Sequence, residues 1–495
     1  MIIKLIATLL CFSLSGSSPA QDGKQQPVAQ TSQQTSQPAR NVQGLPASRV
    51  GEIDSLVSAW MRQHKAPALS VAIVADNKMN FSKGYGLADV ENNVSARNDT
   101  TYRLASVAKS ITAVAAMQLV ERGKLDLDAP INKYCPAYPE KQALKDAPDK
   151  QFSVTARQLL VHQSGVRHNK VPDEIISTRH YTSITEAVGS FAGDALVVEP
   201  ETKYSYSTPG YTLLGCAIEG ASGMSYIDYL RDNIFKPAGM SRTFVDDPYA
   251  IIPNRARGYR KTEKGEIQNA QLHDTSIKIP GGGLVTTAED LAKFAIAVNT
   301  NQLVKAETLA QMWTKPKTRD GKEQGYAAGF LVGADRGQRM IFNDGSQAGT
   351  RTYLYMLPEK GFAVALMTNM ERAWCEELAP KIADIVFGVA PRAEPKVSPT
   401  VSPTPNPNVN PSVYDQYVGQ YQLTPNLVVT VTKEDNRLMG QATGQPKLEL
   451  IPETDVKFSV RGVDAQIVFA KNEQGLVTGL IFKQGGREMQ ASKIK

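Results

Sequence analysis

The chain has 495 residues, more than one domain usually holds, so two or three domains are expected. Hydrophobic residues make up 41% of the sequence, which is enough for a large packed core. The formal net charge of +6 is small for this length and no dense run of lysine and arginine occurs, which argues against a nucleic-acid partner.

The first residues are typical of an export signal. Lys4 supplies a charged start, residues 5–14 are apolar, and residues 18–20 have the small side chains of a cleavage site. The two leucines before Cys11 lack the small residue that precedes a lipid-modified cysteine. Residues 1–20 are therefore predicted to be a signal peptide of a soluble periplasmic or extracellular protein. No later apolar stretch is long enough to span a bilayer, so no stable membrane insertion is expected after cleavage.

Composition divides the rest of the chain into four segments. Residues 21–45 are polar and low in complexity, as in a disordered leader, and residues 393–411 are proline-spaced like an extended linker. Residues 46–392 form the main segment, and residues 412–495 form a short tail.

The main segment is predicted to begin and end with strands and to hold helices between them. Its first helix is expected over residues 50–64, and a hairpin follows with strands at 68–75 and 79–86. Further helices are expected at 155–163, 211–222 and 287–299, and closing strands at 327–334, 339–346, 350–358 and 362–369. This order predicts an α+β fold, in which one antiparallel sheet flanked by helices joins a helical lobe and leaves a cleft between them.

The tail is predicted to be a small antiparallel β domain. Its alternating segments, separated by turn signals, fit a barrel or a sandwich; they lie at 427–433, 457–462, 466–472 and 476–484. The tail contains no catalytic constellation, so an accessory or packing role is expected.

Ser106 and Lys109 lie three residues apart, at the first turn of a predicted alanine-rich helix within residues 102–125. Residues at this spacing share a helix face, so the Lys109 amine can reach the Ser106 hydroxyl. The apolar neighbours indicate burial, which is costly for a lysine unless it is neutral or hydrogen-bonded. S-x-x-K alone is a weak signal, because it recurs by chance on solvated helices where most examples are inert, so a nucleophile with its activator needs support from other motifs.

Four further motifs accompany this pair along the main segment. They are "HQSGV" at 162–166, "YSYSTPGYTLLG" at 204–215, "PGGGLVTTAEDL" at 280–291 and "NDGS" at 343–346. With "LASVAKS", their order resembles the serine β-lactamase and penicillin-binding-protein group, specifically the class C β-lactamase-related serine hydrolases. The resemblance covers nearly all of residues 46–392 and implies a β-lactamase/transpeptidase-like fold. The tail looks like the small β domain that is often appended to such hydrolases.

The resemblance also implies roles for individual residues. Ser106 would be the acylated nucleophile, Lys109 its activator, and Tyr206 the general base, its phenolate favoured by the adjacent ammonium. The backbone N–H groups of Ser106 and Ser346 would form the oxyanion hole, commonly worth about 3 kcal/mol per donor. Tyr204 lies on the same side of an extended strand, and only the family motif favours Tyr206 over it.

Two departures from the family pattern concern the predicted substrate-binding residues, which are Thr208, Asn343 and Gly345. Thr208 stands where the family has asparagine, and Asn343 where it has lysine or histidine. Asn343 can donate a hydrogen bond but offers no charge, so weak recognition of β-lactam carboxylates is expected. Arg351 would restore a cation, although a solvent-facing arginine is the more ordinary interpretation.

These observations predict an exported serine hydrolase that acts on small esters or short peptides through an acyl-enzyme, rather than an antibiotic-resistance β-lactamase. The alternative is a catalytically silent binding or scaffold protein that keeps the fold. No cofactor and no structural metal are expected, and the oligomeric state is left open.

The remaining notable residues have ordinary structural interpretations. Cys135, Cys216 and Cys375 are expected to be buried thiols, with one disulfide possible in an oxidising compartment. His162 has no acidic partner in sequence and is interpreted as a hydrogen-bonded structural histidine.

The glycine run and the tryptophans are interpreted in the same way. Gly281–Gly283 is expected to let backbone approach the cleft, before Thr286 and Glu289 form a capping box for the next helix. The three tryptophans are expected to lie in the core; they are Trp60, Trp313 and Trp374.

Overall fold

The computed structural model describes residues 44–494, except 171–173, 263, 390–408, 425–426, 443–446, 462–464, 473 and 485–486. The predicted signal peptide, most of the leader and most of the linker lie outside the described residues. In the described part, no helix has the length and apolarity that crossing a membrane requires.

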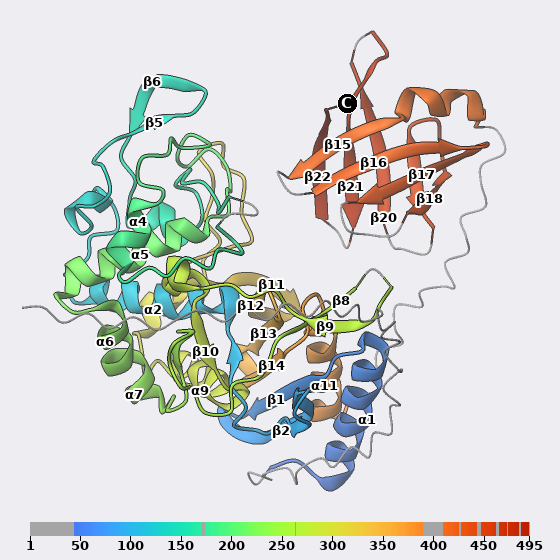
Figure 1. The fold of residues 1–495 in the computed structure, drawn as a ribbon. Helices are drawn as coiled ribbons and strands as arrows, with labels where there is room; N and C mark the ends of the chain where they lie inside the picture. Colours follow the sequence, from blue (N-terminus) through green and yellow to red (C-terminus); the bar gives the residue numbers. More distant parts are fainter. Residues whose placement is uncertain are drawn as a thin grey trace, which may run out of the picture. The chain divides into compact units, whose positions relative to one another are not determined.

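A seven-stranded antiparallel sheet forms the centre of the main segment (Figure 1). Its strand order is β11-β12-β13-β14-β1-β2-β3, so strands from the two ends of the segment meet where Leu69 of β1 lies opposite Thr368 of β14. The strands are β1 (Ala68–Ala75), β2 (Lys78–Asp89), β3 (Val94–Ser95), β11 (Leu331–Asp335), β12 (Gln338–Gln347), β13 (Thr350–Leu357) and β14 (Phe362–Thr368). The predicted closure of one sheet by both ends of the segment is confirmed.

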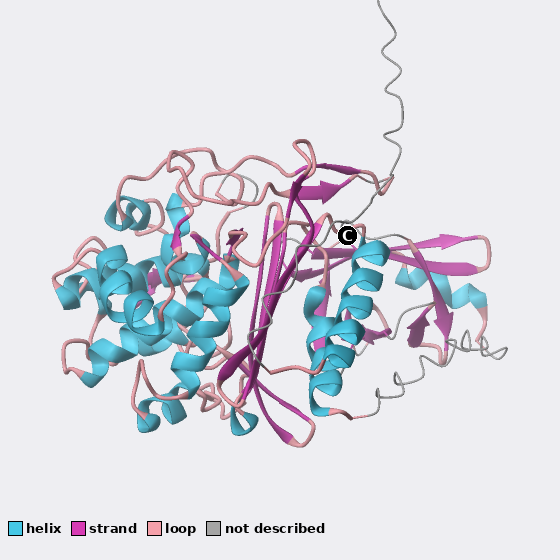
Figure 2. Ribbon diagram, turned by 90° about the horizontal axis from the view of Figure 1, so that it is seen from below, coloured by secondary structure: helices cyan, strands magenta, loops and turns pink. Residues whose placement is uncertain are grey.

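Both faces of this sheet are covered, as Figure 2 shows with the sheet seen on edge. Leu69, Val71 and Ile73 of β1 pack in the cluster that includes α1 and α11, whereas Ala72 and Val74 pack in the cluster that includes α2 and α9. The alternation follows from the two-residue period of a strand. The helices are α1 (Ala47–His64), α2 (Ala108–Glu121), α9 (Ala288–Asn299) and α11 (Leu378–Phe387).

A helical lobe adjoins one face of the sheet (Figure 2), and its residues pack in the same cluster as those of α2. Its remaining helices are α3 (Ala156–Leu160), α4 (Ile184–Gly189), α5 (Thr208–Ser222), α6 (Tyr226–Leu230), α7 (Lys236–Ala238), α8 (Ile279–Gly282) and α10 (Ala306–Met312). Shorter strands complete the segment: β4 (Tyr102–Arg103), β10 (Leu284–Thr286) and β7 (Phe244–Val245) form one sheet, and the pairs β5 (Gln142–Leu144) with β6 (Ala147–Phe152) and β8 (Tyr259–Lys261) with β9 (Ile267–Asn269) form two hairpins.

The tail forms a closed barrel of eight strands, which settles the predicted choice between barrel and sandwich. Five buried aromatic side chains pack in its core, and the rings of Tyr417 and Phe469 stack at 4.2 Å between centroids. The strands are β15 (Gly419–Thr424), β16 (Leu427–Glu434), β17 (Arg437–Ala442), β18 (Leu448–Pro452), β19 (Lys457–Val460), β20 (Ala465–Lys471), β21 (Val477–Gln484) and β22 (Arg487–Lys493). Such filling makes the barrel a packed core rather than a channel.

The structure settles one open choice and corrects two expectations about individual residues. Cys135 and Cys216 form the one disulfide that the sequence analysis allowed, and Cys375 is a buried free thiol as expected. The cap of α9 is Thr287, whose side chain accepts from the Asp290 N–H, one residue beyond the predicted capping box. Trp374 is 54% exposed because its ring stacks under the Arg351 guanidinium near the surface instead of entering the core.

The disulfide should stabilise the main segment. It closes a sequence separation of 81 residues, so the Cys135→Ala/Cys216→Ala variant should lose about 2–4 kcal/mol of unfolding free energy. Urea denaturation followed by tryptophan fluorescence measures this, because the three tryptophans of the sequence all lie in the main segment.

The matched control is Cys375→Ala, which removes a thiol but no cross-link. A reducing agent should shift the urea midpoint of the wild type and of this control, and leave the double variant unmoved. Equal midpoints with and without reductant in the wild type would contradict the prediction.

Candidate active site

Ser106 lies in a single 3₁₀ turn, Ala105–Val107, that leads directly into α2. The chain before it is clamped: Arg103 pairs with Val285 of β10, and its carbonyl accepts from the hydroxyls of Thr350 and Thr352 on β13 at 3.1 Å each. This framework holds the hydroxyl of Ser106 at the edge of the central sheet.

Ala105, immediately before the nucleophile candidate, has a φ of +48° and is 1% exposed. A left-handed conformation is unusual for alanine and persists only where packing imposes it. Gly345 of β12 leaves the space: a Cβ there would lie 3.0 Å from the Ala105 Cβ and 2.6 Å from the Leu104 carbonyl. The strained backbone of Ala105 is therefore imposed by the close packing of β12 against the 3₁₀ turn.

Lys109 is completely buried and its Nζ has three oxygen partners. They are the Ser106 Oγ at 3.2 Å, the Thr208 Oγ1 at 3.2 Å and the Gly281 carbonyl at 2.6 Å. A neutral amine suits this set, because its two N–H groups can serve Thr208 and Gly281 while its lone pair faces the serine hydroxyl.

Tyr206 lies on the other side of Ser106 and donates to the Ser106 Oγ at 2.8 Å. Both of its chain neighbours are held by His162: the Ser205 N–H donates to the His162 carbonyl at 2.7 Å, and the Ser207 N–H to its Nδ1 at 3.1 Å. The structure thus brings Ser106, Lys109 and Tyr206 together, whereas the Tyr204 ring lines the adjoining cavity.

His162 has a structural place, in keeping with its sequence interpretation. Its ring is 1% exposed and lies 4.3 Å from the Tyr206 ring and 4.5 Å from the Tyr326 ring, centroid to centroid. Burial holds the pKa of His162 well below its ordinary value, and a proton on Lys109 would lower it further. A neutral His162 accepts from the Ser207 N–H and so positions Tyr206.

The electrostatics of the amine and the phenol differ from the sequence expectation. Burial, reinforced by the positive charge of Lys278, holds the pKa of Lys109 well below that of an ordinary lysine, although Asp344 opposes this. Burial raises the pKa of Tyr206 despite its hydrogen bond to Ser106. Both directions oppose a phenolate–ammonium pair, so the structure favours a neutral amine and a protonated phenol.

The two predicted oxyanion donors lie at the same edge of the sheet. Ser346 follows Gly345, whose backbone packs against the Ser106 N, and both serines line the cavities on either side of the nucleophile. Their backbone N–H groups remain the predicted donors to a developing oxyanion.

Asn343 lines the larger cavity at Ser106, but its amide is already hydrogen-bonded. It is 2% exposed, and its two N–H groups donate to the Ser110 Oγ at 2.9 Å and to the Gly329 carbonyl at 3.0 Å. Its Oδ1 accepts from the Asp344 N–H at 2.9 Å. Asn343 thus ties β12 to α2, and the predicted substrate contact would have to replace one of these bonds.

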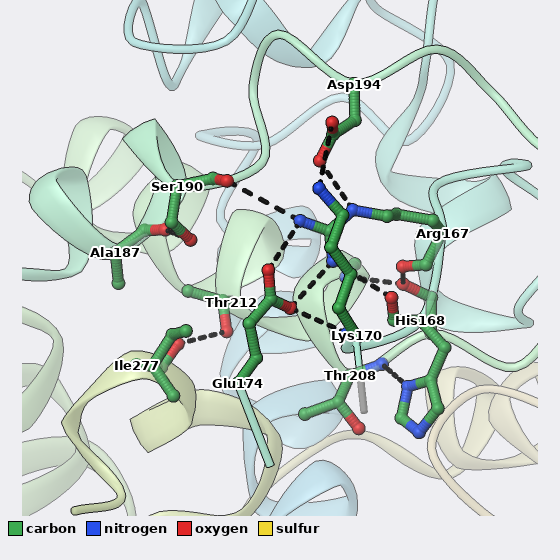
Figure 3. Close-up of polar contacts among 12 residues, drawn as sticks. Arg167, His168, Lys170, Glu174, Ala187, Ser190, Asp194, Thr208, Thr212 and Ile277 are labelled. Atoms are coloured by element: carbon green, nitrogen blue, oxygen red, sulfur yellow. Dashed lines mark hydrogen bonds and ion pairs between the residues drawn. The ribbon is translucent and has the colours of Figure 1, made fainter. Parts of the chain in front are cut away.

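Thr208 and Arg351 also have places that the sequence did not predict. The Thr208 hydroxyl contacts Lys109, and its N–H donates to the His168 Nδ1 at 3.2 Å, as Figure 3 shows. Arg351 is 4% exposed rather than solvent-facing, and it pairs with Asp344 at 2.9 Å and with Glu376. Its charge is thereby already engaged.

Two cavities meet at Ser106. The larger has a volume of about 530 Å³ and an aromatic wall that includes Tyr204, Tyr206 and Tyr326, with Asp344 at its side. The smaller, of about 160 Å³, is lined by polar groups that include His168 and Lys278. Ser106 and Tyr206 line both, so a substrate bound at the nucleophile can extend to either side.

The comparisons with known proteins agree with this geometry. The family model described as Beta-lactamase matches residues 53–373, and one described as a domain of unknown function, DUF3471, matches residues 403–493. The chain belongs to the beta-lactamase family. A relative, the serine beta-lactamase-like protein LACTB, mitochondrial, of Homo sapiens, is 30% identical over 420 residues, covering 64% of this chain and 76% of the relative.

Solved structures of other proteins have folds similar to that of this beta-lactamase family member. The octameric penicillin-binding protein homologue from Pyrococcus abyssi is 23% identical with a TM-score of 0.62, covering 90% of this chain and all of that one. The D-amino acid amidase from Ochrobactrum anthropi is 25% identical with a TM-score of 0.56, covering 68% of this chain and 98% of that one. The predicted family and the predicted fold, a β-lactamase-like domain followed by a small β domain, are confirmed.

Four residues contribute to this beta-lactamase-like site in ways that sequence reasoning missed. The glycine run was expected to approach the cleft, but not the contact of the Gly281 carbonyl with Lys109, and His168 reaches Thr208 only through the folding of its loop. Arg167 fixes that loop by pairing with Glu174 and Asp194 (Figure 3). Lys278 left a signal, a lone lysine in the apolar run "SIKIPGG", which predicts a buried charge.

Gly281→Ala should disturb the amine without unfolding the chain. A Cβ at this position would lie 2.7 Å from the Thr208 Cγ2 and 3.1 Å from the Thr208 carbonyl, so Thr208 or the Gly281 carbonyl must move. Acylation of Ser106 by a serine-directed probe should slow by about tenfold or more, because catalysis is sensitive to sub-ångström displacement.

The neighbouring substitution Gly282→Ala is the control, since its Cβ would meet backbone atoms of Ala105 only at 3.5 Å or more. Adding Thr208→Ser to Gly281→Ala removes the clashing methyl but keeps the hydroxyl, and should recover part of the rate. Equal labelling rates for both alanine variants would contradict this account of Gly281.

Proposed function

We propose that this chain is an exported serine hydrolase that forms an acyl-enzyme on Ser106 and acts on small esters or amides. The observation that carries the proposal is the preassembled contact set of the Ser106 hydroxyl, with an amine at 3.2 Å and a phenol at 2.8 Å. Membership of a serine hydrolase superfamily supports it.

In acylation, the Ser106 Oγ forms a bond to the acyl carbon as its proton passes to the neutral Lys109 amine. The carbonyl oxygen becomes an oxyanion, which the N–H groups of Ser106 and Ser346 stabilise. Tyr206 donates its proton to the leaving group as that bond breaks, and the proton held by Lys109 then restores the phenol. In deacylation, water attacks the ester carbon of the acyl-enzyme with the same proton transfers. This releases the acid and regenerates Ser106.

A silent scaffold is the alternative, suggested by Thr208 and Asn343. Both departures have structural explanations that spare the chemistry: Thr208 still contacts Lys109, and Asn343 ties two elements together. Burying an amine is unfavourable, and a protein without catalysis would be more stable with an apolar side chain in that place. The intact site therefore favours an enzyme.

Esters and small peptides are favoured over β-lactams as substrates. Where the family offers a cation to the substrate carboxylate, this chain has the occupied amide of Asn343 followed by the carboxylate of Asp344. The D-amino acid amidase among the structural relatives acts on amides, which is compatible with this substrate class.

Export rests on the signal-like residues 1–20 and is supported by the Cys135–Cys216 disulfide. Disulfides form and persist mainly in oxidising compartments such as the periplasm and the extracellular space. The relative from Homo sapiens is named as mitochondrial, so the compartment is a property to measure for each member.

A fluorophosphonate probe should label the wild-type chain at one serine, and Ser106→Ala should abolish the label. Lys109→Ala should slow labelling by orders of magnitude, because the proton of Ser106 then has no acceptor. Mass spectrometry of the labelled peptide identifies the site. Absence of label on folded wild-type protein would favour the scaffold alternative.

The same preparation separates esterase from β-lactamase activity. Turnover of a p-nitrophenyl ester should exceed turnover of a chromogenic cephalosporin, and Ser106→Ala supplies the background for both. Faster cephalosporin turnover would contradict the interpretation of Asn343 and Asp344.

Tyr206→Phe should discriminate between leaving groups. If Tyr206 protonates the leaving group, the variant should lose about 10²–10⁴-fold in kcat/KM on an anilide or alkyl ester, and less than about tenfold on a p-nitrophenyl ester, whose leaving group departs as an anion. The acidic limb of the pH profile should persist, because activity rises with pH as Lys109 loses its proton.

The contrasting outcome belongs to a phenolate base. In that case Tyr206→Phe would lower kcat/KM equally for good and poor leaving groups and would remove the limb. Circular dichroism of the variant excludes unfolding as the cause of either result.

A further inference from the structure

Lys278 has a buried side chain with no role in the mechanism described above. It lies in the 3₁₀ turn Ser276–Lys278, is 6% exposed, and lines the smaller cavity together with Ser106. Within the described residues its ammonium has no hydrogen bond and no ion pair. By contrast, the buried guanidinium of Arg351 pairs with carboxylates, and the Lys109 Nζ contacts three oxygens.

The position of Lys278 is held by its backbone. Its N–H donates to the Thr275 carbonyl at 2.9 Å, and its carbonyl accepts from the Gly283 N–H at 3.1 Å. The preceding Ile277 carbonyl accepts from the Thr212 hydroxyl of α5 at 3.2 Å, as Figure 3 shows. These bonds fix the backbone from which the Lys278 side chain extends, so no backbone entropy has to be lost when an anion binds.

The surroundings of Lys278 are electropositive. Burial, with the repulsion of Arg103, lowers its pKa to about 8, so it carries a charge at neutral pH. Asp246 attracts it but already binds the Arg103 Nε at 2.7 Å. The charge of Lys278 in turn lowers the pKa values of Lys109, His168 and His273.

The larger cavity has the opposite character. Asp344 lines it with a side chain that is 39% exposed, and its partner Arg351 is shared with Glu376. An anionic substrate group would be repelled there and attracted to the smaller cavity. The charge difference across Ser106 therefore orients an anionic substrate.

We propose that the substrate carries a carboxylate, and that this carboxylate binds the Lys278 ammonium in the smaller cavity while the scissile carbonyl lies at Ser106. The proposal rests on the proposed function. Gln347 supports it: this residue lines the same cavity, and its Nε2 is buried without an acceptor among the described residues. An unpaired cation and an unpaired amide donor together match the two oxygens of a carboxylate.

Lys278 has one competing role, which is to depress the pKa of Lys109 for every substrate alike. The two roles differ in what they discriminate. A carboxylate-binding residue changes the preference between charged and uncharged substrates, whereas a residue that acts through Lys109 changes both rates together and shifts the pH profile.

The experiment compares matched esters of one chain length. Two carry a carboxylate, one on the acyl half and one on the alcohol half, and each is paired with its uncharged methyl ester; kcat/KM is measured for wild type and Lys278→Met. The wild type should have a higher kcat/KM for at least one carboxylate substrate than for its methyl ester. Lys278→Met should lower the kcat/KM for that carboxylate substrate about 10- to 100-fold, as expected for the loss of a charge-assisted hydrogen bond. Both methyl esters should change by less than about threefold.

Two variants and one label make the result decisive. Lys278→Arg should keep the preference for the carboxylate, and Lys170→Met, which removes a charge that pairs with Asp194 outside the cavity, should leave it unchanged. Fluorophosphonate labelling shows that each variant is folded and active, and its failure on wild type would overturn the proposed function rather than this inference. A wild type without charge preference, or an equal loss on charged and uncharged esters, would overturn the role of Lys278.

Discussion

The site depends on keeping one amine dry. Lys109 is fully enclosed, and an ammonium in such a place is far less stable than in water, so burial drives the amine toward its neutral form. The Lys109 Nζ has three hydrogen-bond partners: the Ser106 hydroxyl, the Thr208 hydroxyl and the Gly281 carbonyl. These groups come from the 3₁₀ turn before α2, the start of α5, and α8. The packing of these three elements therefore positions the partners that make Lys109 a base.

Features that depend on local geometry could be predicted from the sequence. The three-residue spacing of Ser106 and Lys109 brings them together wherever a helix forms, and strand-like runs bounded by turn signals identified the strands that close the sheet. Tyr206 depended on the family resemblance, because nothing local distinguishes it from Tyr204. In the structure His162 distinguishes the two tyrosines. Its carbonyl and Nδ1 accept hydrogen bonds from the backbone N–H groups on either side of Tyr206.

Features that depend on long-range packing could not be predicted. The partner of Cys135 was open because three cysteines allow several pairings. Arg351 was expected to face solvent, and its ion pair with Glu376 could not be predicted because that residue comes from a later turn. The expected protonation states meet the same limit: pairwise logic favours a phenolate beside an ammonium, whereas burial lowers the pKa of Lys109 and raises the pKa of Tyr206. Asn343 was read by its motif position, but its neighbours Ser110 and Gly329 come from other elements.

The relocation of positive charge from the third motif to Lys278 affects both recognition and chemistry. Lys278 repels a proton on Lys109, so the empty site has the stronger bias toward a neutral amine. A carboxylate bound at Lys278 would offset part of that repulsion and make Lys109 a stronger base as the substrate arrives. Burial is the larger cause of the lowered pKa and remains after binding, so the amine can stay neutral while its basicity rises. A charge placed beside the base, rather than at Asn343, thereby couples the occupancy of the smaller cavity to proton transfer at Ser106.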